Sequence, residues 1–423
     1  MARAATSSAT PPQQGILAGL RVIEGSAFVA APLAGTTLAA LGADVIRFDP
    51  IGGGLDSTRW PLKRESGASM FWAGLNQGKR SIAVDIRDER GQALLTDLIC
   101  APGADAGLFV TNFPARGWLA YEALAAKRPD LIMVNLIGRR DGGSEVDYTV
   151  NPQIGFPVLT GPAHTDAPTN HVFPAWDSIA GNMIVTALLA ALRRRDRTGE
   201  GQLVTLALKD VGLAMIGHLG MLAEAEVDGV ARPRFGNDLY GAFGRDFATL
   251  DGRRAMVVGL TDLQWSTLVK ATGIGDGVAA LARDLGLDLR DEGNRFRARD
   301  GIAALLTPWF AQRTLAEVRA AFDAHRVTWG PYRSVRQALD EDADLSTANP
   351  MFGTVDSPGI GAHLAPGSPL HFSRSARLAP RRAPALGEHT DEILATLLGL
   401  SATEIRNLHQ AGLIASAAGT ASS

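Results

Sequence analysis

Short β-rich runs alternate with helical segments over about the first 140 residues, and this alternation limits the possible folds more than any other feature of the sequence. Strands are expected at residues 20–23, 43–48, 79–85, 107–110 and 131–136. Helices are expected between them at residues 30–41, 88–99 and 118–127. Strands that alternate with helices in this way form a parallel sheet covered on both faces. The sequence therefore predicts an α/β fold whose large domain is a doubly wound, Rossmann-like parallel sheet.

Changes in composition predict how the chain is divided into domains. Residues 1–14 are expected to be a disordered leader, because they are rich in Ala, Ser, Thr and Pro and lack the apolar run of a signal peptide, and 415–423 a disordered tail. A charged connection at 224–237 indicates a domain boundary. We expect a large domain formed by two parts of the chain. The first part is 15–223, and the second lies within 331–414, which begins with a return linker. A smaller α+β domain is expected to be inserted at 224–330.

Further elements are expected outside the first sheet. A long loop is predicted at residues 139–170, where Gly, Asp, Pro and Thr replace the periodic pattern. In the inserted domain, a hairpin turning at Asp251 and Gly252 precedes helices. The expected helices are 263–272, 294–312 and 315–326 in the inserted domain, and 390–398 and 403–410 near the end of the chain.

Charge and residue usage exclude several classes of protein. The net charge of -3 shows no excess of positive charge for binding nucleic acid. Cys100 is the only cysteine in the sequence, so an intramolecular disulfide is excluded. The eight histidines show no metal-ligand spacing, and GxGxxG, GxSxG and Walker A motifs are absent. No window approaches the roughly 18 uninterrupted apolar residues of a membrane span. We therefore expect a soluble cytoplasmic protein without metal, nucleic-acid or membrane partners.

One carboxylate, Asp177, stands at the start of an otherwise apolar helix at 173–192. An acid in this place is favoured by the exposed N–H groups and the dipole of the helix, so a capping role is the common explanation. A nucleophilic carboxylate is the rarer one. Local sequence leaves both open.

A resemblance to a known family adds to this pattern. The matching motifs occur in order at Asp49-Pro50, 76–85, 110–113, 349–352, 366–369 and 387–391. They resemble those of the class III (family III) coenzyme A transferases, the formyl-CoA transferase and carnitine CoA-transferase group, over residues 19–414. The resemblance implies an interlocked homodimer, with the large domain made from both chain ends. It also implies an acyl-CoA substrate, so that coenzyme A arrives as part of the substrate and no cofactor is permanently bound.

The resemblance assigns a role to Asp177. In the family, the nucleophilic aspartate opens a helix with a glycine one turn later and a Thr-Gly-x-Gly-Gln turn after its end. Asp177, Gly181 and residues 198–202 match these positions. The implied chemistry is attack of the aspartate on the thioester, giving an anhydride and then an aspartyl-CoA thioester.

The expected contacts with the substrate depart from the better-known relatives. The active-site glutamine of formyl-CoA transferase falls at Val29 here, and two of its CoA-contacting cations fall at Pro50 and Ile137, whereas Arg87 keeps a cation. The expected CoA contacts are Arg87, Lys79, Arg116, Arg139, Val29 and Asn112, of which Lys79, Arg116 and Arg139 are equally explained as surface charges. The expected substrate contacts are Arg59, which would pair with a free carboxylate, Trp60 and Phe71. Backbone N–H groups at 25–30 are candidate oxyanion donors, and 52–60 and 235–241 are candidate lids.

Four functions remain open within this family fold. Residues 24–33, 48–56 and 71–76 most resemble members that move CoA between the two carboxyl groups of one C5 dicarboxylate. Transfer between an acyl-CoA and a separate acid is the first alternative. The others are α-methylacyl-CoA racemase, whose histidine has no counterpart in 137–160, and a CoA-binding protein without activity.

Overall fold

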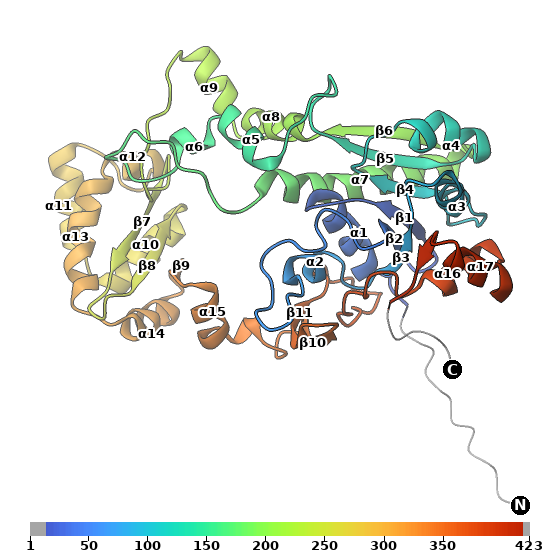
Figure 1. The fold of residues 1–423 in the computed structure, drawn as a ribbon. Helices are drawn as coiled ribbons and strands as arrows, with labels where there is room; N and C mark the ends of the chain where they lie inside the picture. The colour runs from blue at the N-terminus through green and yellow to red at the C-terminus, as the bar shows by residue number, and fades with distance from the viewer. Residues whose placement is uncertain (1–13, 418–423) are drawn as a thin grey trace, which may run out of the picture. The chain divides into compact units, whose positions relative to one another are not determined.

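The computed structural model describes residues 14–417, which form two compact units (Figure 1). The larger unit contains the chain up to Ile154, the segment Val172–Leu222 and the chain from Ala343. The smaller unit contains Gly155–His171 and Ala223–Asp342. The sequence predicts 224–330 for this smaller unit. The structure adds the short segment Gly155–His171 and continues the unit to Asp342. The expected leader and tail lie almost wholly outside the described residues.

A seven-stranded sheet forms the centre of the larger unit, in the order β12-β3-β2-β1-β4-β5-β6. Its strands are β1 (Arg21–Gly25), β2 (Asp44–Pro50), β3 (Arg80–Val84), β4 (Leu108–Thr111), β5 (Ile132–Ile137), β6 (Gln202–Ala207) and β12 (Ile414–Ala415). All neighbours pair in parallel except β12, which pairs antiparallel with β3. The predicted doubly wound, Rossmann-like sheet is therefore confirmed, with one unpredicted edge strand. The direction of winding reverses between β1 and β4, which is where ligands approach such sheets.

Side chains alternate between the two faces of the sheet. Ile23, Phe48 and Ile82 point to one face, where they form a core with four helices. These helices are α3 (Glu89–Ile99), α4 (Tyr121–Lys127), α16 (Thr390–Leu398) and α17 (Ala402–Gln410). Glu24 and Arg47 have the opposite parity, and Glu24 lies against α1 (Ala30–Ala40). The face of the sheet beneath α1 therefore carries charged side chains.

The long helix α7 (Ala175–Thr198) lies beside α1. The close approach depends on Gly181, because a Cβ there would lie 2.8 Å from the carbonyl oxygen of Ala30 and 3.2 Å from Leu33 Cβ. By length and composition α7 could cross a membrane, although no such segment is expected from the sequence, and 33% of its most apolar window is buried in the structure. The core helix of a water-soluble protein passes the same test.

The segment 139–170, expected to be a loop, contains α5 (Asp147–Gln153) and α6 (Phe156–Leu159). Both helices are too short to show a helical period, and Pro152 lies inside α5. The remaining elements of the larger unit are α2 (Met70–Leu75), η1 (Gly117–Leu119), α8 (Leu208–His218), η2 (Ala343–Leu345) and the hairpin β10 (Phe352–Ser357) with β11 (Gly361–Pro366). Helix α9 (Met221–Val227) begins at the end of this unit.

The smaller unit is an α+β module with its own core. Its sheet has the order β7-β8-β9, and the predicted hairpin turn at Asp251 and Gly252 is confirmed. The strands are β7 (Phe243–Ala248), β8 (Arg254–Gly259) and β9 (Trp329–Pro331), and the helices are α10 (Asp262–Thr272), α11 (Gly275–Leu285), α12 (Glu292–Arg297), α13 (Arg299–Ala311), α14 (Leu315–His325) and α15 (Val335–Glu341). The helix predicted at 294–312 is broken at Ala298, and α11 and α15 were not predicted.

The contact at Gly181 leads to a stability prediction. We expect Gly181→Ala to destabilise the protein in denaturant unfolding, because overpacking costs about 1–3 kcal/mol, whereas alanine gains at most about 1 kcal/mol of helix propensity. Gly217→Ala in α8 is the matched control, since a Cβ there meets nothing within 4 Å. Equal stabilisation by both substitutions would contradict the role given to Gly181.

Candidate active site

Asp177 lies in the first turn of α7 and is not its cap. The helix begins at Ala175, and the capping position is Pro174, which makes no side-chain bond. The capping alternative for Asp177 is therefore wrong. Asp147 of α5 does this work instead, because its Oδ2 accepts from the N–H groups of Trp176 at 2.7 Å and of Asp177 at 3.1 Å. Two carboxylates thus meet at the start of one helix.

The surroundings of Asp177 disfavour the ionised form of its carboxyl group. Burial and, to a smaller extent, the negative charge of Asp147 raise its pKa from 3.8 to about 7, although the positive charge of Arg59 acts in the opposite direction. Removing hydration from a carboxylate and placing another anion beside it both disfavour the charged form. A carboxylate with so little solvation is the kind of group expected to react with a thioester.

Arg59 is held between two aromatic rings. Its guanidinium carbon lies 5.5 Å from the ring centre of Phe28 and 5.2 Å from that of Phe71. A cation near the faces of two rings is attracted by both. The structure therefore brings together Asp177, Arg59 and Phe71 as expected, whereas the neighbouring Trp60 side chain is 78% exposed.

The loop after β1 lies at the reversal point of the sheet. Asn112, which follows β4, accepts from the Ala27 N–H at 3.0 Å and donates to the Ala27 carbonyl at 2.8 Å. The Phe28 N–H donates to Asp56 at 3.0 Å. Of the amides expected to bind an oxyanion, these two are thus engaged. Within residues 14–417, the N–H groups of Val29 and Ala30 at the start of α1 donate to no other group.

A cavity of about 810 Å³ lies beyond the carboxyl ends of β2, β3 and β4. Three aromatic side chains, Phe48, Phe113 and Trp118, contribute to its walls, and Arg87 is the one basic residue among the described residues that line it. Arg116 is exposed on the segment between Phe113 and Trp118. Aromatic walls beside a cation suit a flat heterocycle joined to phosphate.

Two of the expected cations are already paired. Lys79 is enclosed, and its Nζ donates to Glu24 Oε1 at 2.8 Å, to the Pro32 carbonyl at 2.9 Å and to Asn76 Oδ1 at 3.0 Å. Burial lowers the pKa of Lys79 to about 8. Lys79 therefore offers no surface to a phosphate and leaves the expected set. Arg139 is partly exposed and pairs with Asp141.

Three residues of the site, Asp147, Asp56 and Phe28, were not predicted from the sequence. Asp147 lies in a segment predicted to be a loop, and a capping acid contributed by another helix leaves no local pattern. Of the candidate lids, residues 52–60 include Asp56 and Arg59, whereas residues 235–241 belong to the smaller unit, where Phe235 stacks on Tyr240 at 5.5 Å. Their movement stays a prediction. In the described part of the chain, no group of three or more His, Cys, Asp or Glu residues is placed to hold a metal ion.

The chain is similar to known coenzyme A transferases over almost its whole length. Residues 17–390 match the sequence profile of CoA-transferase family III. The chain is 67% identical over 402 residues to 2-methylfumaryl-CoA isomerase of Chloroflexus aurantiacus, covering 95% of this chain and 98% of that protein. It is 29% identical over 413 residues to succinyl-CoA–D-citramalate CoA-transferase of the same organism, with the same coverage of 95% and 98%.

A solved structure supports the fold. The crystal structure of a CAIB/BAIF family protein from Brucella suis matches with a TM-score of 0.74 and 28% identity, covering 91% of this chain and 100% of that one. The arrangement around Asp177 thus occurs on a fold shared with that family.

The raised pKa of Asp177 leads to a prediction about stability. The folded state keeps this proton up to about pH 7, whereas the unfolded chain releases it near 3.8, so stability falls with rising pH between these values. The slope from one proton is at most about 1.4 kcal/mol per pH unit. We expect Asp177→Asn to melt at a higher temperature than wild type at pH 8 and at the same temperature near pH 4. An unchanged difference across this range would contradict the assignment, and Asp166→Asn, an exposed acid, is the control.

Proposed function

The chain belongs to CoA-transferase family III, and on that premise we propose that it moves coenzyme A between the C1 and C4 carboxyl groups of mesaconyl-CoA, as a 2-methylfumaryl-CoA isomerase. The observation that carries this proposal is the 67% identity over 95% of the chain to an enzyme of that name. The partly buried Asp177 supplies the group that the reaction needs.

The reaction follows from what a carboxylate does to a thioester. The Asp177 carboxylate attacks the thioester carbonyl, the C–S bond breaks, and a mixed anhydride and CoA thiolate result. The thiolate attacks the aspartyl carbonyl and releases the dicarboxylate, leaving an aspartyl-CoA thioester. The other carboxylate of the same dicarboxylate then attacks this thioester, and the steps run in reverse. Acyl activation is conserved at each stage, so the sequence of steps balances without any other reactant.

The neighbours of Asp177 have separate tasks in this scheme. Burial keeps its carboxylate poorly solvated and therefore reactive. The amides of Val29 and Ala30 are the donors for the oxyanion that forms at the carbonyl under attack. Arg59 binds whichever carboxylate of the substrate is free, which retains the dicarboxylate while it turns.

The large cavity is the proposed site for the nucleotide end of CoA. Phe113 and Trp118 would face the base, and Arg87 would pair with a phosphate, with Arg116 at the edge. Asn112 acts on the site by holding the loop after β1 through its two bonds with Ala27, and Val29 ends this loop at the start of α1. Arg139 and Trp60 stay candidate contacts with the substrate. Coenzyme A enters as part of the substrate, and we further propose an interlocked homodimer in the cytoplasm, as the family resemblance implies.

A turnover experiment tests the activity. We expect the protein to convert mesaconyl-C1-CoA to the C4 isomer, measured by chromatography, without incorporating labelled free mesaconate. Label in the product would show transfer to a separate acid, and deuterium from solvent at Cα would show racemase chemistry. Asp177→Asn is expected to lose at least about 10³-fold in rate, since the covalent route is removed. Full activity in that variant would remove Asp177 from the mechanism.

The pH profile tests the electrostatic setting of Asp177. The nucleophile must be deprotonated, so kcat/KM is expected to fall about tenfold per unit below about pH 7. Asp147→Asn removes the like charge but keeps an oxygen for the N–H groups of α7, so this decline is expected to begin at lower pH. A profile that does not move would contradict the role of Asp147. Asp97→Asn, a surface acid of α3, is the control.

A further inference from the structure

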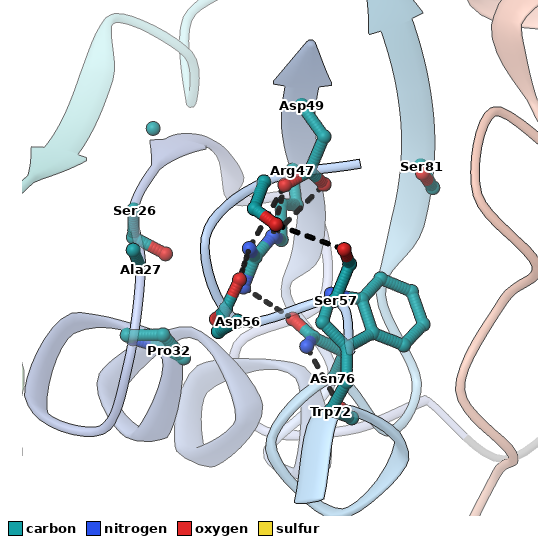
Figure 2. A network of polar contacts seen from close by, with 12 residues as sticks. Ser26, Ala27, Pro32, Arg47, Asp49, Asp56, Ser57, Trp72, Asn76 and Ser81 are labelled. Carbon is teal, nitrogen blue, oxygen red and sulfur yellow. Dashed lines mark hydrogen bonds and ion pairs between the residues drawn. The ribbon is translucent and has the colours of Figure 1, made fainter. Parts of the chain in front are cut away.

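A buried arginine stands in the middle of β2, on the face of the sheet that α1 covers. Figure 2 shows Asp49, Asp56 and Asn76 converging on the guanidinium of Arg47. Arg47 donates to Asp49 at 2.9 Å, to Asp56 at 2.8 Å and to Asn76 at 3.2 Å, and its side chain is 1% exposed. A buried charge is tolerated only when it is paired and hydrogen-bonded, so these partners cannot be removed freely.

Asp56 is the member of this network that reaches the active site. It is 1% exposed although it lies in a loop whose other residues include the 79% exposed Leu55. One oxygen of its carboxylate binds Arg47, and the other accepts from the Phe28 N–H at 3.0 Å. Its own carbonyl accepts from the Arg59 N–H at 3.2 Å. One buried residue thus joins β2, the loop after β2 and the loop after β1.

Phe28 has a backbone conformation that needs such support. Its φ is +69°, a region that costs a bulky residue about 1–3 kcal/mol and persists only where neighbours enforce it. The bond to Asp56 and the paired bonds of Ala27 with Asn112 enforce it. In this conformation the Phe28 ring lies 5.5 Å from the guanidinium carbon of Arg59. Strain of this kind is concentrated at functional sites.

The network is also poorly satisfied for a purely stabilising core. Within the described chain, Glu24 Oε2 and Trp72 Nε1 are buried without a hydrogen-bond partner, and both residues border the same network. Unpaired buried polar atoms lower stability, and an apolar replacement of a buried ion pair is often equally stable or more so. Stability alone therefore does not explain these charges.

We infer that Arg47 and Asp56 are positioning residues that hold Phe28 and Arg59 in the geometry that receives the free carboxylate of the substrate. The inference rests on the proposed function and identifies what makes the site selective for acyl groups with a second carboxylate. Neither residue needs to touch the substrate. Asp56 acts through the backbone of Phe28 and Arg59, and Arg47 fixes Asp56.

The experiment uses the first half of the reaction, in which Asp177 takes CoA and the acid is released. Formation of the aspartyl-CoA thioester is timed by intact mass with succinyl-CoA and with butyryl-CoA, which lacks the second carboxylate. At about pH 9, above the acid limb of the profile, we expect Asp56→Asn to slow the succinyl reaction by about 10²-fold and to leave the butyryl reaction within about twofold. Because the half-reaction does not require isomerisation, its outcome is separate from that of mesaconyl-CoA turnover.

Two further readouts separate positioning from simple loss of structure. Arg59→Met should reproduce the selective loss, and Asp56→Asn should add nothing in that background, since Asp56 acts through Arg59. Both variants should also move the acid limb of the pH profile upward, because Arg59 opposes the effects of burial and of Asp147 on the pKa of Asp177. Equal losses for both thioesters, or additive effects, would overturn the inference.

Matched variants control for folding. Asp130→Asn breaks an ion pair with Arg128 at the amino end of β5, away from the carboxyl edge, and should leave selectivity unchanged. Phe28→Gly keeps the network, relieves the positive φ and removes the ring. The Phe28→Gly protein should therefore remain folded and still lose selectivity for succinyl-CoA. If Asp56→Asn does not fold, Phe28→Gly tests whether the geometry of Phe28 and Arg59 sets the selectivity. A Phe28→Gly protein with wild-type selectivity would also overturn the inference.

Discussion

Removing a carboxylate from water costs free energy, and in the larger unit the carboxylate of Asp177 is partly removed from water. Gly181 allows α7 to approach α1, and Asp147 covers the first N–H groups of α7 while adding a second negative charge. The result is a carboxyl group with a pKa of about 7, as the proposed nucleophilic role requires of a group that must ionise near neutral pH.

The sheet of the larger unit supports the strained and charged groups of the site, such as Phe28 and Arg47. The parallel sheet and the core on its other face hold β1, β2 and β4 in register. Phe28 keeps an unfavourable φ, and Arg47 keeps a buried charge, because both are fixed by several bonds to these strands and their loops. The stability of the sheet thus maintains the positive φ of Phe28 and the buried charge of Arg47, which are unfavourable by themselves.

Features that depend on residues close together in the sequence could be predicted, whereas features that depend on contacts between distant residues could not. The strands and the helix at Asp177 have local patterns, and the ordered motifs predicted the family and led to the proposed role of Asp177. Asp147, Asp56 and the conformation of Phe28 depend on partners distant in sequence, so no local pattern marks them. The two-residue strand β12 is too short to be predicted, and Lys79 lies at the amino end of β3, whereas ligands meet the carboxyl ends. Arg87, which follows β3, lies at the cavity.

Covalent transfer of coenzyme A to Asp177 is the central claim, and peptide mapping of the intermediate tests it most directly. The protein would be mixed with mesaconyl-CoA, quenched within the turnover time, digested and examined by mass spectrometry. The account predicts a CoA thioester on the peptide that contains Asp177, lost on treatment with hydroxylamine and replaced there by a hydroxamate. A thioester on another residue, or isomerisation by Asp177→Asn at the wild-type rate, would contradict it.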